Sequence, residues 1–377
     1  MAQGFVLGFV TLKAAAFLMI CCSPPPPLVC FSILNSHGRA NSLAFGIKNL
    51  KHHPQIFLIS CVLIATLAFL ILRPGPKPVK FKSRIAIPGF QSSALVILAH
   101  EQGYFKDEGV EVTLEYKALG RDCLALVVAG KADLAVVFET PVVRSLLEGN
   151  KISVLTELHR SEFNAAIVAR KDRGIANAHD LIGKTVAIVA KTNAEFHLDL
   201  LLRSHLIDPA TLKIKQMAVD EVLEALLSGH VDAASLWEPF VSQAVHKKPE
   251  KLLQFRSSFY SEFSMLAGMH ANLQTKREES LAILRALIRA QDYFDKKNGE
   301  ARSTVERILK QQNFFVSPLS WDQMDVKLGL SATLLTMFSV EADWYRAQDK
   351  LSGPKQLDNI FIGSYLKSLA PDLVTYE

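Results

Sequence analysis

Cysteine is nearly missing from the part of the sequence that can form a folded domain. Four of the five cysteines lie at or before Cys61, and only Cys123 follows them. A single cysteine cannot form an intramolecular disulfide framework or a cysteine-based metal site. Both are therefore excluded for the region that follows Lys80.

Acidic side chains are absent from residues 1–80, whereas seven lysines and arginines occur there. This imbalance accounts for the formal net charge of +5, because the remaining sequence holds 35 basic and 37 acidic residues. A nearly neutral domain gives no sign of the basic surface that a polyanion needs. Nucleic acid is therefore not expected as a partner.

The sequence signatures of several enzyme classes are missing as well. The sequence contains no G-x-S-x-G, no P-loop, no G-x-G-x-x-G and no H-E-x-x-H. These patterns indicate hydrolases, nucleotide-binding proteins, dinucleotide-binding proteins and zinc proteases. His197 lies in an expected helix among apolar neighbours, which favours a structural role. We expect a protein that is not an enzyme and that has no cofactor, no metal and no catalytic residues.

One apolar run dominates the segment that precedes the globular part. Residues 56–72 carry no charge, and basic residues lie on both sides of them. A run of this length is at the short end of what a bilayer-spanning helix needs. The run stays apolar up to Arg73 and does not end at a small-residue cleavage site. We therefore expect an uncleaved transmembrane helix over residues 55–73, anchored in the cytoplasmic (inner) membrane.

Other features of this leader leave alternatives open. Residues 58–61 resemble a bacterial lipoprotein box, although an apolar stretch follows Cys61 where a polar tether is usual. A second apolar run at residues 5–22 is a first span, a poorly inserting segment or sequence upstream of the true start. The proline-rich residues 74–78 predict a stiff linker. We expect residues 1–80 to tether a globular domain outside the membrane, facing the periplasm or cell exterior.

A short pattern occurs twice in the globular part. Residues 130–139 and 229–238 share the form G-x-x-D-x-A-x-x-[aromatic]-E. Ordinary helix–turn–strand joints explain the glycine and the aspartate of each copy. They do not explain the matching aromatic–glutamate pairs at the end of each apolar run. The exit of a buried strand is where an open α/β sheet presents ligand-binding groups.

The two copies also complete two longer repeats. The interval from Ile85, in an expected first strand, to Asp133 nearly equals the interval from Val186 to Asp232. Within each interval, expected strands alternate with expected helices, which predicts mostly parallel, doubly wound α/β sheets. We therefore expect two similar lobes that face one cleft.

Residues 98–112 resemble a segment of a known family, A-x-x-x-G-[YF]-F-x-x-E-G-[LV]-x-V. It belongs to solute-binding proteins of the nitrate/sulfonate/taurine class of ABC transporters, which share the thiamine-pyrimidine-synthase-like (SsuA-like) domain. Further matches cover residues 130–135, 181–187 and 232–240, in the same order and spacing. The resemblance extends over roughly residues 82–300.

This resemblance implies the type II periplasmic binding protein fold, with two doubly wound α/β lobes joined by two crossover segments. The crossovers are expected near residues 169–170 and 264–268. Residues 81–170 together with 265–377 would form lobe 1, and residues 171–264 would form lobe 2.

The resemblance also implies which residues line the cleft between the lobes. Loops that open helices offer free N–H groups to anions, and Trp237 offers a flat apolar wall. Glu139 and Glu238 would hold an ammonium or ring amine. The expected ligand-binding residues are Gln91, Ser92, Glu139, Thr140, Phe163, Lys191, Thr192, Asn193, Trp237 and Glu238.

Plainer roles stay open for several of these residues. Glu139 and Glu238 could each serve the first turn of a following helix, since acids favour that position. Lys191 could be a solvated surface charge, and Trp237 could be part of a lobe core.

The expected function is the extracytoplasmic solute-binding component of an ABC importer. Its ligand would be a small organic ion, either sulfonate-, taurine- or nitrate-like or a pyrimidine amine. Its partners would be an ABC permease and ATPase and, through the N-terminal helix, the membrane, with the domain itself a monomer. The alternatives are a membrane-tethered ligand-sensing domain and a thiamine-pyrimidine-synthase-like enzyme. That enzyme branch uses a histidine as substrate and a cysteine-rich iron motif, which this sequence lacks.

Overall fold

The computed structural model describes residues 6–11, 14–21, 28–34, 40–46, 78–256, 260–316, 318–349, 351, 353 and 360–376. It divides the chain into one unit of residues 1–74 and another of residues 75–377. The first unit contains an antiparallel sheet of four strands in sequence order. These are β1 (Val6–Thr11), β2 (Ala14–Cys21), β3 (Leu28–Leu34) and β4 (Ala40–Gly46).

The expected membrane anchor at residues 55–73 lies outside the described residues. Among the helices that the structure does describe, none is both long and apolar enough to cross a membrane. Most of the second apolar run, residues 5–22, lies in β1 and β2 and not in a helix. The three alternatives for this run stay predictions.

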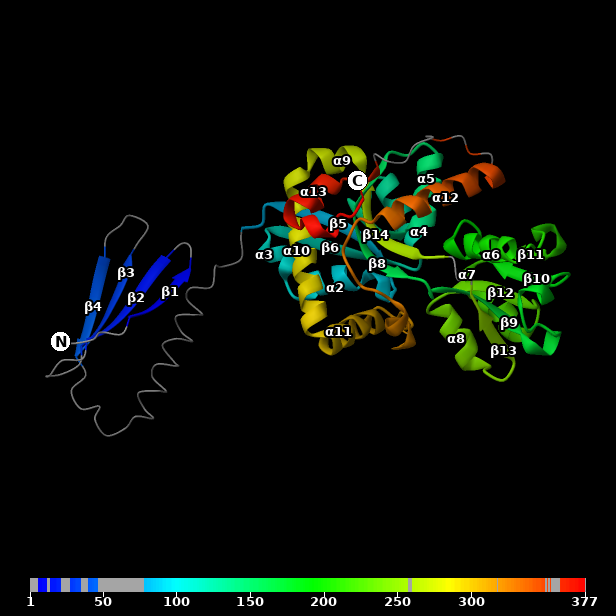
Figure 1. The fold of residues 1–377 in the computed structure, drawn as a ribbon, viewed down its shortest axis with the longest axis horizontal. Coiled ribbons are helices and arrows are strands. Elements are labelled where there is room, and N and C mark those ends of the chain that lie inside the picture. The colour runs from blue at the N-terminus through cyan, green and yellow to red at the C-terminus, as the bar shows by residue number, and fades with distance from the viewer. Residues whose placement is uncertain are drawn as a thin grey trace. The chain divides into compact units, whose positions relative to one another are not determined.

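The larger unit contains two five-stranded sheets. Most of their strands are labelled in Figure 1. The first sheet has the order β6-β5-β7-β14-β8 and the second the order β11-β10-β12-β9-β13. The strands of the first are β5 (Phe81–Pro88), β6 (Val110–Lys117), β7 (Leu134–Phe138), β8 (Ile152–Ser161) and β14 (Glu262–Met269). Those of the second are β9 (Ala165–Arg170), β10 (Thr185–Ile188), β11 (Lys213–Gln216), β12 (Ala233–Trp237) and β13 (Leu252–Phe255).

Each sheet combines a parallel half with an antiparallel half. The strands β6, β5 and β7 run parallel, as do β11, β10 and β12. By contrast, β14 runs antiparallel to both its neighbours, and so does β9. The expectation of mostly parallel sheets is therefore only half right. The chain passes from one sheet to the other before β9 and again before β14, and each of these strands runs antiparallel to its neighbours.

These changes of sheet occur earlier in the chain than the sequence predicts. The strand β9, whose residues were assigned to lobe 1, pairs with β12 and β13 in the second sheet. The strand β14 already belongs to the first sheet at Glu262. The crossovers placed near residues 169–170 and 264–268 are therefore wrong, since the chain has changed sheet before Ala165 and again before Glu262.

Helices cover both sheets. In the part of the chain that the structure describes, they are α2 (Ala94–Glu101), α3 (Tyr104–Asp107), α4 (Gly120–Val128), α5 (Glu139–Leu147), α6 (Asn193–Ser204), α7 (Val219–Ser228), α8 (Phe240–Lys247), α9 (His270–Thr275), α10 (Arg277–Lys296), α11 (Asn298–Gln311), α12 (Ala332–Asp349) and α13 (Gly363–Leu369). All side chains of β7 and of β12 are buried. Strands that are covered on both faces read as continuous apolar runs, as these do.

The repeated aspartates have the same structural role in both lobes. Asp133 accepts a hydrogen bond from the backbone N–H of Arg84 at 2.8 Å, and its own N–H donates to the Arg84 carbonyl at 2.9 Å. Asp232 makes the same pair of bonds with Thr185, at 2.8 and 2.9 Å. Each aspartate thus connects the first strand of its repeat, β5 or β10, to the start of the third strand, β7 or β12. The two glycines before them adopt positive φ values of 67° and 88°, as expected of residues that end a helix.

The C-terminal segment returns to the edge of the first sheet. Short backbone bridges join Glu157 to Gly329 and Arg160 to Asp325 along β8. This coverage matters because an uncovered edge strand exposes unpaired N–H and C=O groups. The segment therefore completes lobe 1 and reaches the end of β8 that lies nearest the cleft.

Candidate ligand-binding cleft

The candidate site lies where the loops at the strand exits of the two sheets meet. Two small cavities remain there between side chains, with volumes of about 30 Å³ and about 10 Å³. We call them the Thr192 cavity and the His159 cavity. The first is lined by Phe90, Leu119, Gly120, Arg121, Phe138, Pro141, Thr192, Asn193 and Trp237. The second is lined by Phe90, Gln91, Ser92, Phe138, His159, Asn164, Glu238 and Met324.

Six of the ten residues expected from the sequence lie in these linings. They are Gln91, Ser92, Thr192, Asn193, Trp237 and Glu238. Both lobes contribute, because Gln91 and Ser92 follow β5 whereas the other four lie at or after the ends of β10 and β12. The ends of the two motif copies therefore lie at one shared cleft.

The helix α6 opens onto the Thr192 cavity. Thr192 precedes its first residue, but the Thr192 hydroxyl donates to the Val189 carbonyl at 2.7 Å and does not cap the helix. The Asn193 amide donates to the Glu262 carboxylate at 2.8 Å. The two side-chain donors are thus used within the protein, and the positive end of the helix is the group directed at the cleft.

Aromatic rings from both lobes fill much of the cleft. Phe90 from lobe 1 meets Phe240 from lobe 2 edge-on, with ring centroids 6.2 Å apart. Phe240 in turn meets Trp237 edge-on at 5.6 Å. Edge-to-face pairs at this separation are favourable, so they stabilise the contact between the lobes. Trp237 is therefore part of an apolar wall that includes a ring of the other lobe.

Glu238 lines the His159 cavity and also caps a helix. Its Oε2 accepts a hydrogen bond from the Ser242 N–H at 3.1 Å, in the first turn of α8. Its Oε1 lies 3.6 Å from a guanidinium nitrogen of Arg256. Burial raises the pKa of Glu238, although the Ser242 bond and Arg256 oppose that rise. The helix-serving alternative is therefore confirmed for Glu238, and its role toward a ligand stays a prediction.

Glu139 and Thr140 are fully buried and do not line either cavity. Glu139 accepts hydrogen bonds from the Tyr260 hydroxyl at 2.6 Å and from the Phe263 N–H at 3.0 Å. The Thr140 hydroxyl donates to Glu341 at 3.1 Å. Their predicted contact with a ligand stays a prediction, and both carboxylate oxygens of Glu139 already have protein partners.

A cluster of three buried carboxyl groups lies behind the cleft. Glu139 belongs to α5, Glu262 to β14 and Glu341 to α12. Burial raises the pKa of Glu139 to about 7 and that of Glu262 to about 8, and it raises the pKa of Glu341 well above its usual range. The mutual repulsion of these groups adds to the effect for Glu262 and Glu341. The cluster therefore holds protons at neutral pH.

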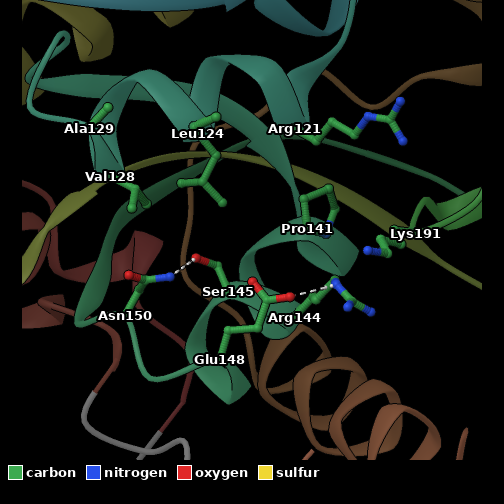
Figure 2. Close-up of a pocket in the computed structure, with 11 residues that line it drawn as sticks. Arg121, Leu124, Val128, Ala129, Pro141, Arg144, Ser145, Glu148, Asn150 and Lys191 are labelled. Atoms are coloured by element: carbon green, nitrogen blue, oxygen red, sulfur yellow. Dashed lines mark hydrogen bonds and ion pairs between the residues drawn. The ribbon is translucent and has the colours of Figure 1, made fainter. Parts of the chain in front are cut away.

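Lys191 and Phe163, the last two expected residues, are exposed. Lys191 lines a surface groove of about 410 Å³ between α4 and α5, together with Arg121 and Arg144. Figure 2 shows these three cationic side chains along one side of the groove. Arg144 is paired to Glu148 at 2.9 Å. The Phe163 ring is 53% exposed. For Lys191 the surface alternative is confirmed, and a ligand role of Phe163 stays a prediction.

Several lining residues were not expected from the sequence. Arg121 follows β6 and donates to the Ala190 carbonyl of lobe 2 at 2.9 Å, which connects the lobes across the cleft. The sequence signal for Arg121 was its position directly after the expected strand of residues 111–118. Phe90, in the loop after β5, could have been found in the same way. Met324 could not, because it comes from the C-terminal segment.

Comparisons with known proteins bear on the fold and the family. A Bacillus subtilis (strain 168) protein named as an aliphatic sulfonates-binding protein is 26% identical over 167 residues, covering 43% of this chain and 50% of that protein. A Haemophilus influenzae (strain ATCC 51907 / DSM 11121 / KW20 / Rd) protein named as a thiamine biosynthesis protein is 26% identical over 236 residues, covering 60% of this chain and 73% of that protein. The match thus spans half the length of the first relative and about three quarters of the second.

The solved structures show the same architecture. The periplasmic aliphatic sulphonate binding protein SsuA from Escherichia coli superposes with a TM-score of 0.64 at 14% identity, covering 76% of this chain and 99% of that one. This likeness confirms the expected periplasmic-binding-protein-like α/β fold with two sheets. Residues 91–301, more than half of the chain, match the family model described as NMT1/THI5 like. The chain therefore belongs to the NMT1/THI5-like family.

Proposed function

We propose that this protein is the solute-binding component of an ABC importer, which holds a small organic ion or amine between its two lobes. One observation carries the proposal: the strand exits of two sheets converge on a cleft with aromatic walls and few, well-placed polar groups. Such linings are typical of small-molecule sites. The name of the B. subtilis relative supports a solute-binding role.

Opening and closing of the lobes follows from the size of the cavities. One water molecule needs roughly 10–15 Å³ of such space, so cavities of about 30 and 10 Å³ have room for about two water molecules and about one, and not for an organic solute. The lobes must separate for a ligand to enter, and this breaks the Arg121–Ala190 bond and the Phe90–Phe240 contact. Ligand binding would then favour a closed state by hinge motion.

The partners follow from the same proposal. A closed, ligand-loaded domain would dock on an ABC permease with its ATPase, and an open one would not. A membrane-spanning anchor at residues 55–73 would keep the domain near that permease on the outer side of the cytoplasmic membrane. The cationic groove of Arg121, Arg144 and Lys191 lies beside the Thr192 cavity, because Arg121 and Pro141 line both.

The test is calorimetric titration with taurine, butanesulfonate, nitrate and 4-aminopyrimidine. We expect one of these to bind in the micromolar range or tighter and to raise the melting temperature. Trp237→Ala should weaken binding at least tenfold, because it removes the apolar wall. The matched control is Trp321→Ala, because the Trp321 ring packs on Phe294 and lines neither cavity. Absence of binding by all four solutes would contradict the proposal.

The second candidate is a thiamine-pyrimidine-synthase-like enzyme. The name of the H. influenzae relative favours it, because that protein is named for thiamine biosynthesis. Turnover of 4-aminopyrimidine or a related ring, detected by mass spectrometry of the incubated solute, would support the enzyme. Recovery of the bound solute unchanged would support the solute-binding role.

A further inference from the structure

His159 is a buried histidine whose ring lacks a hydrogen-bond partner in the described part of the chain. It lies near the end of β8 and is 1% exposed. Neither ring nitrogen has a partner among the described residues. Buried polar side chains nearly always have one, so this imidazole requires an explanation.

The position of the ring is fixed by its neighbours in the sheet. In the central strand β14, Ser264 lies directly opposite both Phe138 of β7 and His159 of β8. Residues opposite one another share one face of a sheet. The Phe138 and His159 rings meet edge-to-face over this small serine, with centroids 5.6 Å apart and planes at 87°. The Ser264 hydroxyl is buried and also lacks a partner within the described residues.

The His159 side chain also lines the cavity that is named after it. Ser92, from the loop after β5, lines this cavity too, and its buried hydroxyl has no partner among the residues described. The cavity volume of about 10 Å³ is at or below the roughly 10–15 Å³ that one water molecule needs. At most about one water molecule therefore fits between these groups.

We propose that His159 contacts the ligand directly and that His159 and Ser92 together bind one end of it. This inference rests on the proposed function and specifies the chemistry of that end. Hydroxyl groups and a neutral imidazole each both donate and accept hydrogen bonds. No described lysine or arginine lines this cavity, and Glu238 provides a carboxylate there. The ligand group that fits this lining is uncharged and both donates and accepts hydrogen bonds. Examples are an aromatic ring nitrogen beside an amino group, an amide and an alcohol.

The electrostatics agree with an uncharged end. Burial lowers the pKa of His159 to about 3, so the ring is neutral at physiological pH. A sulfonate or nitrate only accepts hydrogen bonds, so it would leave the accepting nitrogen of a neutral imidazole unpaired. The charged end of an ion would instead lie toward the Thr192 cavity, where α6 begins and Arg121 is near.

The experiment compares full-length His159→Leu and His159→Gln with the wild-type protein. Calorimetry with 4-aminopyrimidine and with butanesulfonate measures affinity, and thermal melting without solute measures stability. We expect His159→Leu to lower the affinity for 4-aminopyrimidine at least tenfold, while the melting temperature stays equal or rises because unpaired buried groups are removed. His159→Gln keeps a donor and an acceptor and should bind within about threefold of the wild type.

The matched control is His197→Leu, because His197 is equally buried in α6 but lines neither cavity. It should leave the affinity unchanged.

If the wild type binds 4-aminopyrimidine and His159→Leu binds it as tightly, the inference is overturned and the solute-binding function stands. A lower melting temperature of His159→Leu, with binding that His159→Gln does not restore, would assign a purely structural role and also overturn it. If the wild type binds butanesulfonate but not 4-aminopyrimidine, the proposal that one end of the ligand both donates and accepts hydrogen bonds is refuted. Failure of the wild type to bind any tested solute would count against both proposals.

Discussion

At the scale of single residues, the two aspartates of the doubled motif have a role that the sequence only partly revealed. Asp133 and Asp232 were expected as turn residues, and the structure shows each bonded to the first strand of its own repeat. Asp133 also pairs with Lys276 at 2.8 Å. The aspartates therefore stabilise the order of strands inside each repeat.

Replacing either aspartate with alanine should destabilise the protein by about 1–2 kcal/mol, because a backbone N–H loses its acceptor. Asp133→Ala and Asp232→Ala should be nearly additive, since they lie in different lobes. Urea denaturation followed by circular dichroism measures both effects. Glu250→Ala, at an exposed site, should leave the midpoint unchanged. A midpoint of Asp232→Ala equal to that of the wild type would contradict the role.

The buried carboxyl groups should make stability depend on pH. The raised pKa values of Glu139 and Glu262, about 7 and 8, mean that the folded protein keeps protons that the unfolded chain has lost. Stability should therefore fall as pH rises from 6.5 to 8.5, by on the order of a few kcal/mol. Below pH 6.5 the two histidines oppose this trend, because burial lowers the pKa of His159 to about 3 and of His197 to about 4, so the unfolded chain binds protons there that the folded protein does not.

Urea denaturation across this pH range tests the carboxyl cluster. Glu262→Gln mimics the protonated group and can still accept from Asn164 and Asn193. It should flatten the decline between pH 6.5 and 8.5, whereas the exposed Glu250→Gln should not. An unchanged slope in Glu262→Gln would show that this carboxyl does not titrate in that range.

At the scale of elements, α12 packs against helices of both lobes. Its Glu341 accepts from Thr140 of α5, and its Trp344 ring lies 5.2 Å from Phe196 of α6. Gln348 reaches Asp199 of α6 at 3.5 Å. This helix from the C-terminal segment therefore holds the lobes together on the side behind the cleft.

Trp344→Ala should destabilise the protein by about 3 kcal/mol, in the range found when a buried aromatic ring is removed. Trp344→Phe keeps a ring against Phe196 and should recover most of this loss. Far-ultraviolet circular dichroism in urea avoids reliance on the tryptophan signal. A loss below about 1 kcal/mol would mean that α12 contributes little to holding α6.

The elements also show how far the sequence could predict this molecule. The similar spacing from Ile85 to Asp133 and from Val186 to Asp232 predicted two lobes and the strand exits between them. The reversed direction of β9 and β14 was not predictable, because short apolar runs carry no sign of strand direction. Glu341 was equally hidden, since its partner Thr140 lies 201 residues away in the sequence.

At the scale of the whole molecule, polar and aromatic contacts join the lobes at the cleft, and one of them is the Asn193 amide that donates to Glu262 at 2.8 Å. The Arg121 guanidinium donates to the Ala190 carbonyl just before α6, and Phe90 packs on Phe240. A single hydrogen bond of this kind contributes about 0.5–1.5 kcal/mol. Loss of the Arg121 bond alone should therefore shift the balance between the closed and open arrangements by about that amount.

Arg121→Ala should open the cleft more often and raise amide hydrogen exchange at the start of α6 by several-fold. Arg121→Lys keeps the charge but should restore only part of the protection, because its ammonium must reach the same carbonyl. Mass spectrometry of peptides covering residues 188–198 gives the readout, with Arg307→Ala as an exposed control. Equal exchange in Arg121→Ala and the wild type would contradict the role of this bond.

The paired aspartate bonds have a consequence for the heat of binding. Because each lobe holds its own strands and strand exits in place, the surfaces that meet a solute are preformed before it arrives. Closure then buries apolar rings such as Phe90 and Trp237 without ordering the chain. The heat capacity change on binding should accordingly be negative and set by that apolar area, with little of the large unfavourable entropy that accompanies coupled folding.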